Sequence, residues 1–312
     1  MVSSKIKYMF IIKHRRYFFV FSLVLILVSL FSLMTYGLNL GIDFKGGSII
    51  EVGYLAQRPA LDQIKTSLAP LNLGAYTLQP VGDKAVSIRL KELDQTGKDS
   101  LMKALSLNGQ APVKENQSST IGPSLGKELE TKGMIAIVIV VLLIIIFVAF
   151  AFRSVSYPIK SWKYGVAAII ALVHDIIIAV GAMSLLAHFF GAEADALFLT
   201  ALLTILGLSV NDTIVIFDRI RENLRLKISN SFEEEVGISL GQTIIRSMNV
   251  TSTIVIVLVA MLLFGPVSIK YFTAVLIVGM ISGAYSSIFV AAPVLVEWEM
   301  WSRNKAVAKI KR

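Results

Sequence analysis

Long apolar runs constrain this 312-residue chain more than any other feature of its sequence. A helix needs about 20 apolar residues to cross a hydrocarbon core roughly 30 Å thick. Only 16% of the residues are charged and 55% are hydrophobic, which is too apolar for an ordinary soluble protein. The sequence therefore predicts a polytopic α-helical membrane protein. Six spans are expected, at Tyr17–Tyr36, Met134–Phe152, Tyr164–Leu186, Leu197–Asn223, Ser247–Phe264 and Tyr271–Trp298.

The distribution of positive charge sets the expected topology. Lysine and arginine are frequent before residue 17, after the second span (Arg153, Lys160, Lys163), after the fourth span and at residues 300–312. The short loops on the other side hold only Lys270. Because cytoplasmic segments carry such an excess, both termini are expected in the cytoplasm. The first run is too long for a cleaved signal peptide and lacks a small-residue cleavage site, so it is expected to remain as a span.

Composition also excludes several function classes. The net charge of +9 belongs to the cytoplasmic segments, and no basic patch with interleaved aromatic residues suggests nucleic-acid binding. Cysteine is absent, so disulfides and cysteine-based metal sites are excluded. We expect no cofactor and no metal.

Residues 37–132 have the mixed composition of a soluble domain, expected on the outer, periplasmic side between the first two spans. Apolar alternation and turn residues predict the order strand, helix, strand, strand, helix, strand. This order is typical of an α+β ferredoxin-like domain. The strands are expected at Ser48–Tyr54, Tyr76–Pro80, Ala85–Leu90 and Val113–Thr120, and the helices at Ala60–Leu71 and Lys98–Leu107.

A glycine-rich segment with Gly41, Asp43, Phe44, Gly46 and Gly47 opens this domain. It lacks the Gly-Lys-Ser or Gly-Lys-Thr ending and the following helix of a phosphate-binding loop. A tight structural turn that leads into the first strand is the better interpretation.

The chain is thus expected to comprise an N-terminus and first span (1–36), the outer domain (37–132), five further spans (133–299) and a basic tail (300–312). Ser231 and Glu234 match a capping box. This pattern opens an amphipathic segment, for which we expect an interfacial helix near 231–245 on the inner membrane face.

The fourth span carries an acid, Asp212, within an otherwise apolar segment. A charge near the bilayer centre costs roughly 2.5–3.5 kcal/mol even on insertion scales, so an acid there is by default a functional candidate. The alternative is a structural acid satisfied by neighbouring amides or hydroxyls. At 100° per residue, one polar face runs beside Asp212 and is expected to point into the bundle. It consists of Thr200, Thr204, Gly207 and Asn211.

Arg246 marks the inner end of the fifth span. Its long side chain can extend several ångströms toward Asp212. Since a nearby arginine favours the ionised carboxylate and burial favours the neutral one, approach and withdrawal of Arg246 would switch a proton on and off Asp212. We therefore expect a proton-coupled site with Asn211, Thr204 and Asp175 as further members.

The third span carries His174 next to Asp175. Adjacent helix positions point about 100° apart, so the two are not expected to pair with each other. His174 either relays protons or hydrogen-bonds a backbone carbonyl. The other supporting candidates are Thr213, Asp218, Arg219 and Arg221, of which the charged ones also suit a solvated helix end with local ion pairs.

Gly279 and Gly283 form a GxxxG pattern in the sixth span, with Ser282 and Ser286 at the same spacing. Small residues four apart allow two helices to approach closely. We expect these residues to serve helix packing, with no catalytic role.

Several segments together resemble the SecD/SecF family of bacterial protein-export subunits, which belongs to the RND superfamily. They are GIDFKGGSIIEV (41–52), IGPSLGKEL (121–129), LVHDIII (172–178), LSVNDTIVIFDRIREN (208–223) and TIIRSMNVTST (243–253). The matches span nearly the whole chain, with Leu208 standing where an aromatic residue is expected. The resemblance implies an RND-type half of six spans that pairs with a homologous SecD half.

The same resemblance implies that the chain uses the proton-motive force to promote translocation of unfolded preproteins through the SecYEG channel. It places the chain in the bacterial inner membrane, with YajC and YidC as further possible partners. Asp212 and Arg246 fall on the family's proton-pathway positions, and Asp175 falls on another family motif.

Without the resemblance, the residues indicate only a proton-coupled protein that forms half of a larger assembly. Sodium could replace the proton, because one carboxylate with amide and hydroxyl neighbours suits either ion. An RND-type exporter of small molecules or lipids is the main alternative, although such exporters usually hold two six-span halves in one chain. A membrane scaffold is another. An enzyme is disfavoured because His174 and Asp175 lack a nucleophile or metal ligand at suitable spacing.

Overall fold

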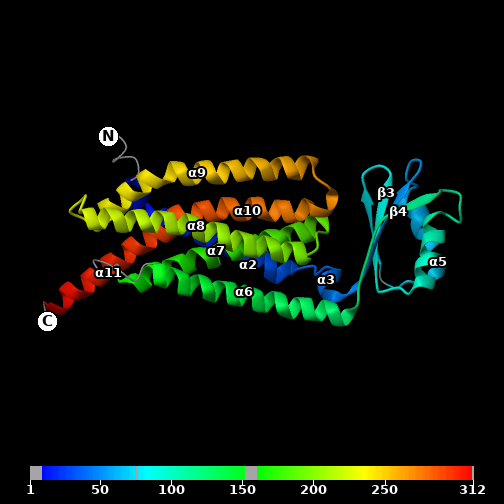
Figure 1. Ribbon diagram of the computed structural model, residues 1–312, viewed down its shortest axis with the longest axis horizontal. Helices are drawn as coiled ribbons and strands as arrows, with labels where there is room; N and C mark the ends of the chain where they lie inside the picture. Colours follow the sequence, from blue (N-terminus) through cyan, green and yellow to red (C-terminus); the bar gives the residue numbers. More distant parts are fainter. Residues whose placement is uncertain (1–8, 75, 152–159, 311–312) are drawn as a thin grey trace. The chain divides into compact units, whose positions relative to one another are not determined.

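The computed structural model describes residues 9–74, 76–151 and 160–310 (Figure 1). Residues 1–8 and Arg153, which contribute to the predicted cytoplasmic charge, lie outside the described residues. The chain forms two compact units. A sheet-containing unit comprises Leu40–Ile135 and Ala194–Ala196, and a helical unit comprises the rest.

Six helical stretches among the described residues are long and apolar enough to cross a membrane. They occupy Arg15–Tyr36, Pro123–Val148, Trp162–Phe190, Ala196–Leu226, Phe232–Phe264 and Val267–Asn304. These stretches contain five of the six predicted runs and match the second, Met134–Phe152, as far as Val148, while Phe152 lies outside the described residues. They confirm the expected polytopic helical protein. The corresponding elements are α2 (Arg15–Tyr36), α6 (Pro123–Ala151), α7 (Ser161–Phe190), α8 (Ala196–Leu226), α9 (Phe232–Phe264), α10 (Lys270–Ser286) and α11 (Ala292–Ile310).

The helix α9 runs without interruption from Phe232 to Phe264. The predicted separate interfacial helix near 231–245 is therefore wrong, because residues 242–264 contain neither proline nor glycine to end a helix. The predicted cap is confirmed, since the Ser231 hydroxyl accepts a hydrogen bond from the Glu234 amide at 3.2 Å.

The sixth apolar run is not one regular helix. A 3-10 turn, η2 (Val267–Ile269), precedes α10, and a π-helical turn, η3 (Ser287–Ala291), separates α10 from α11. The basic residues expected as a tail continue α11 as far as Ile310. Ser286 directly precedes this π-turn, and π-turns inside helices often mark functional sites.

Close approach of small residues holds α10 against α8. A Cβ atom added at Gly279 would lie 2.1 Å from Ile205 Cδ1, and one added at Gly283 would lie 3.0 Å from Ser209 Cβ. An alanine at Gly279 would overlap Ile205, and one at Gly283 would be tight against Ser209, so the two glycines allow this close approach of the helices. The N-terminal helix α2 is held similarly, with Gly181 of α7 lying directly against Ser29.

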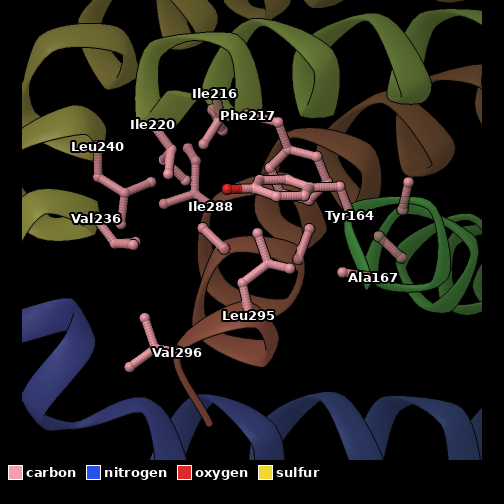
Figure 2. Packing of buried hydrophobic residues seen from close by; sticks show 14 of the residues in the cluster. Tyr164, Ala167, Ile216, Phe217, Ile220, Val236, Leu240, Ile288, Leu295 and Val296 are labelled. Atoms are coloured by element: carbon pink, nitrogen blue, oxygen red, sulfur yellow. The ribbon is translucent and has the colours of Figure 1, made fainter. Parts of the chain in front are cut away.

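The apolar core of the helical unit surrounds Tyr164, a fully buried residue of α7. Figure 2 shows its ring directed toward Ile216, Phe217 and Ile220 of α8 and Ile288 of the π-turn. The rings of Tyr164 and Phe217 meet edge to face, with centroids 5.3 Å apart. Aromatic pairs of this geometry add about 0.5–1.5 kcal/mol beyond area burial, so this contact fixes how α7 and α8 meet.

The sheet-containing unit confirms the predicted order of strands and helices. Its strands are β1 (Gly47–Tyr54), β2 (Thr77–Val81), β3 (Ala85–Leu90) and β4 (Val113–Ile121), and its helices are α4 (Leu61–Leu68), extended by the 3-10 turn η1 (Ala69–Leu71), and α5 (Gln95–Leu105). The sheet order is β2-β3-β1-β4, and every neighbouring pair is antiparallel.

Alternation along β1 explains the core of this unit. Ile50, Val52 and Tyr54 are buried, and they pack with apolar residues of β3, α4 and α5. The buried Tyr54 hydroxyl donates to the Leu105 carbonyl at 3.0 Å, which joins the end of β1 to the end of α5. Burial raises the pKa of Tyr54, while the Arg58 guanidinium opposes that shift.

The glycine-rich segment is a structural turn, as predicted. A short helical turn, α3 (Ile42–Lys45), leads into Gly46 and Gly47, whose φ angles of 76° and 138° lie where side chains are strongly disfavoured. The Gly41 amide donates to the Ala194 carbonyl at 2.8 Å, and the Asp43 carboxylate accepts from the Ala196 amide at 2.8 Å. Phe44 is half-buried. These contacts anchor the turn to the segment Ala194–Ala196.

Candidate ion-coupling site

Asp212 lies on the side of α8 that meets α9. It is 8% exposed, and the Thr251 hydroxyl lies 3.5 Å from its Oδ2. That distance is at the outer limit for a hydrogen bond, so the carboxylate is weakly restrained by its own chain. An acid that is buried but loosely held can change its protonation state without breaking a network.

Arg246 does not approach Asp212. It is exposed on α9, and no hydrogen bond or ion pair joins it to another described residue. The expected contact is wrong because α9 presents Thr251 to Asp212, and a residue five positions away points about 140° in another direction.

The predicted polar face of α8 points away from its own bundle. Thr200, Gly207 and Asn211 are exposed and Thr204 is half-buried, so the expectation that they face inward is wrong. The core takes the opposite side of α8, where Ile205, Leu206, Ser209, Ile216 and Phe217 are buried.

The neighbouring helix α9 also exposes polar side chains within its membrane-spanning length. We call these exposed residues of α8 and α9, together with the half-buried Thr204, the α8/α9 polar surface. It comprises Thr200, Thr204, Gly207 and Asn211 of α8 and Arg246, Asn249, Ser252 and Thr253 of α9. Polar side chains at membrane depth face protein or water and not lipid. The α8/α9 polar surface therefore indicates a further contact outside this chain.

Asp175 has the opposite environment, a fully buried and saturated one. Its Oδ2 accepts from the hydroxyls of Ser209 at 2.6 Å and Ser286 at 2.8 Å. Its Oδ1 accepts from Ser282 at 2.8 Å. These donors come from α8 and α10, so the carboxylate links three helices at the centre of the unit.

His174 and Asp175 do pair, contrary to the sequence-based expectation. The imidazole Nδ1 lies 3.0 Å from Asp175 Oδ1, and both side chains are buried. The 100° rule describes where adjacent Cβ atoms point, but rotation about the histidine side-chain bonds brings the ring back over its neighbour. The ring also stacks on Tyr285 of α10, with centroids 6.1 Å apart.

The remaining candidates lie apart from both acids or serve structure. The Thr213 and Ser287 hydroxyls share a hydrogen bond of 2.8 Å between α8 and the π-turn. At the end of α8, Arg219 pairs with Glu222 at 2.7 Å and Arg221 pairs with Asp218, which confirms the predicted local ion pairs.

Sequence reasoning missed four hydroxyl residues near the acids. Thr251 and Ser209 carried no pattern that distinguished them from other small polar residues. Ser282 and Ser286 were noticed only as packing residues, although their spacing of four on one helix face was the available signal. What the sequence did not indicate is that this face meets Asp175, which lies more than 100 positions away.

Comparison with known proteins agrees with this architecture. Residues 102–301 match the family described as protein export membrane protein SecD/SecF, C-terminal, and residues 31–54 match the SecD/SecF GG motif. The second match includes the turn around Gly46 and Gly47. The two matches thus cover both units of the structure.

Two relatives of similar length carry the same name. The chain is 38% identical to the protein translocase subunit SecF of Thermobaculum terrenum, over 97% of this chain and 96% of that protein. It is 36% identical to the protein of the same name from Anaerolinea thermophila, over 93% and 94%.

Among solved structures, SecDF of Thermus thermophilus, a translocon-associated membrane protein, superposes with a TM-score of 0.79 at 29% identity. The alignment covers 92% of this chain and 38% of that longer chain. On the sequence matches and this shared architecture, the chain belongs to the SecD/SecF family of protein export membrane proteins.

Proposed function

We propose that this chain is one half of a SecD/SecF complex that uses the proton-motive force to promote preprotein movement through the Sec translocase. In this proposal Asp212 binds the coupling proton. Asn211, Thr204 and Arg246 belong to the same site, and the partner half completes that site. The proton is the proposed coupling ion, and the chain acts as an accessory subunit without a catalytic centre or cofactor.

The α8/α9 polar surface is the observation that carries the proposal. Asn211 is exposed directly beside Asp212 on a helix that spans the membrane. Facing lipid, two asparagines and several hydroxyls would be costly. A homologous SecD half placed against this surface would cover it and put Asp212 at the boundary between two halves. This chain corresponds to 38% of the Thermus SecDF chain, which leaves room for such a half.

An acid at that boundary suits energy conversion. Motion of one half against the other would change the solvation of the Asp212 carboxylate and therefore its affinity for a proton. One charge that crosses 100 mV releases about 2.3 kcal/mol, so a few protons suffice for a large conformational cycle. The hydrogen-bond partners of the Asp175 carboxylate all belong to this chain. Asp175 would therefore move together with this half of the complex.

The proposed orientation puts both termini in the cytoplasm and the sheet-containing unit outside it. Arg15 at the start of α2 pairs with Glu297 of α11 at 2.6 Å, so the first and last helices meet at one membrane face. The excess of lysine and arginine supports a cytoplasmic assignment of that face in the bacterial inner membrane.

We assign the outer unit to the ferredoxin-like class. Its antiparallel order β2-β3-β1-β4, with a helix after β1 and another after β3, supports this assignment. We propose that this unit contacts unfolded preproteins that emerge from SecYEG. YajC and YidC are further proposed partners of the chain.

The test compares Asp212→Asn with Asp218→Asn in inverted membrane vesicles that contain the SecD partner and SecYEG. Asp218 is an exposed acid six positions along the same helix, so its variant controls for charge loss. We expect Asp212→Asn to abolish the stimulation of precursor translocation by a proton gradient, and Asp218→Asn to retain it. Undiminished stimulation in Asp212→Asn, with normal SecD association, would contradict the proposal.

Ionophores separate the coupling ions. A protonophore should remove the stimulation in wild-type vesicles, whereas a sodium ionophore should leave it. The opposite pattern would assign the site to sodium.

A further inference from the structure

The sheet of the outer unit has two edge strands, β2 and β4. The order β2-β3-β1-β4 leaves one side of each without a neighbouring strand among the described residues. A free edge presents a row of unpaired backbone amides and carbonyls, which can pair with another chain. Native proteins usually blunt such edges with proline, charged side chains, a bulge or a very short strand. The two edges of this sheet differ in these features.

Hydrogen bonds at the end of β1 show which way its backbone groups point. The Tyr54 amide donates to the carbonyl of Lys84, just before β3, at 2.7 Å. The next amide, that of Leu55, donates to the carbonyl of Pro112, just before β4, at 3.3 Å. Backbone groups of a central antiparallel strand alternate between its two neighbours. The even-numbered residues of β1 therefore bond to β3, and the odd-numbered residues bond to β4.

This alternation identifies the β4 residues that face the free side. The β1 residues 47, 49 and 51 lie opposite Ile121, Ser119 and Gln117. Ser118 and Thr120 alternate with these bonded residues, so their amides and carbonyls are directed away from β1. The Thr120 and Ser48 hydroxyl oxygens lie 2.9 Å apart, which agrees with the closer side chains of a pair that exchanges no backbone hydrogen bonds.

The other edge of the sheet is closed by proline. The β3 residues that do not bond to β1 bond to β2, where they lie opposite Thr77, Gln79 and Val81. Pro80 therefore occupies a position directed to the free side, where it has no amide hydrogen to offer. The strand β2 is also only five residues long, whereas β4 has nine residues. The β2 edge is thus protected against pairing.

The first half of β4 is protected as well. The Glu115 carboxylate pairs with Lys98 of α5 at 2.9 Å. Asn116 is the extra residue of a bulge, and its side-chain amide donates to the Glu51 carboxylate at 3.1 Å. Residues 117–121 contain no charge, no proline and no bulge. They form an unprotected stretch close to the usual strand length of about 5–6 residues, which we call the open β4 edge.

The chemistry of the open β4 edge selects its occupant. The donors and acceptors of a strand edge are matched by another extended backbone, and side-chain pockets add the sequence preference. The exposed side chains here carry one amide and three hydroxyls, on Gln117, Ser118, Ser119 and Thr120. They offer no apolar pocket and no charge, whereas permanent subunit interfaces bury an apolar core. The edge therefore suits transient binding of an extended chain of almost any sequence.

We infer that the open β4 edge binds an extended segment of unfolded preprotein as an added β-strand, through the backbone groups of Ser118 and Thr120. The choice of a preprotein as occupant rests on the proposed function, whereas the edge itself does not. Every polypeptide carries the same backbone groups. Recognition through the backbone therefore lets one site serve preproteins of unrelated sequence.

The test measures peptide binding to the full chain, reconstituted with its SecD half in lipid nanodiscs. The probe is a soluble, fluorescent peptide of alternating threonine and valine, followed by anisotropy with empty nanodiscs as the blank. A second peptide of the same sequence carries methyl groups on its backbone nitrogens and cannot donate from either edge. We expect saturable binding of the first peptide and at least about fivefold weaker binding of the second. Equal binding of the two, or no saturable binding, would overturn the inference.

A proline variant tests the location. Ser118→Pro removes an outward amide while leaving the hydrogen bonds to β1, which gives β4 the protection that Pro80 gives β2. Ser118→Ala is the matched control, because it removes the hydroxyl and keeps the amide. Ser118→Pro should weaken peptide binding at least about fivefold, and Ser118→Ala should bind as wild type does. Unchanged binding in Ser118→Pro would overturn the assignment to this edge. If Ser118→Pro does not fold, the two peptides and the wild-type chain decide.

The same samples separate other occupants of the edge. Peptide binding to the chain alone that disappears when SecD is present would assign the edge to SecD and overturn the inference. A dimer of this chain that dissociates in Ser118→Pro would assign it to a second copy, with the same consequence. Failure of peptide binding while Asp212→Asn still abolishes proton-driven stimulation would contradict the edge alone. Backbone-dependent binding with an inactive role for Asp212 would contradict the proposed function alone.

Discussion

The contact between Gly279 and Ile205 gives the sharpest stability prediction. Substitution Gly279→Ala adds one methyl group where α10 meets α8. That methyl would lie 2.1 Å from Ile205 Cδ1 and 2.4 Å from Cγ1. Carbon atoms in contact lie about 3.5–4.0 Å apart, so the overlap is roughly 1.4–1.9 Å. The two helices must separate, or Ile205 must change its rotamer.

The structure limits both responses. Ile205 is 1% exposed and β-branched, so its side chain has few rotamers and no free space. Overpacking in such a site costs about 1–3 kcal/mol. Alanine is the better helix former by about 1 kcal/mol, which partly offsets the cost. We expect Gly279→Ala to lower the free energy of unfolding by about 0–2 kcal/mol, and to leave it about 1–3 kcal/mol less stable than an alanine variant that gains the helix propensity without the overlap.

The assay is unfolding of the purified chain in mild detergent by titration with sodium dodecyl sulfate, followed by tryptophan fluorescence. Gly207→Ala in α8 is the matched control, because Gly207 is exposed and no heavy atom lies within 4 Å of the added methyl. The control should be as stable as wild type or more stable. Equal stability of the two alanine variants would refute the reasoning.

A double-mutant cycle tests the partner. Ile205→Ala alone should cost about 2–5 kcal/mol through the cavity that it leaves. In the double variant the methyl group added at position 279 fills part of that cavity, so the combined cost should fall below the sum of the single costs by at least about 1 kcal/mol. Additive costs would show that Ile205 is not what the added methyl meets.

Two further predictions concern single hydrogen bonds. Tyr54→Phe removes the bond to the Leu105 carbonyl and should destabilise the full chain by about 1 kcal/mol in thermal unfolding at neutral pH. Because burial raises the pKa of Tyr54, its contribution is fully present below about pH 10 and is lost as the pH rises further, so wild type and Tyr54→Phe should converge there. Ser231→Ala removes the cap of α9 and should cost about 1 kcal/mol, whereas Ser231→Asp should restore it; equal stability of all three would contradict the capping role.

Local patterns explain why much of the fold could be predicted. Apolar runs longer than a bilayer require helices, and alternation along β1 requires one buried face, so the spans and the strand order follow from short-range sequence. Ser231 and Gly46 are similar cases, because a cap or a positive φ angle depends on a few neighbouring residues. The interfacial helix was mispredicted because amphipathicity near residue 240 does not reveal whether a helix ends there.

The arrangement around the acids depends on contacts that local patterns do not contain. A polar helix face normally points inward, but the one next to Asp212 points outward, as expected if the proposed SecD half covers it. Likewise, the sequence does not reveal that Ser282 and Ser286 meet Asp175 across two helices. Residue types thus identified the acids, whereas their partners depend on the tertiary structure and, in the proposed function, on the SecD half.

Infrared titration of Asp212 tests the central claim most directly. The complex with the SecD half, reconstituted in lipid, would be titrated from pH 5 to pH 9, and the carboxyl signal assigned by subtraction of the Asp212→Asn spectrum. The account predicts that a protonated carboxyl band of Asp212 appears at low pH and disappears within this range. A carboxyl that stays in one form throughout, in a complex that is active in translocation, would contradict it.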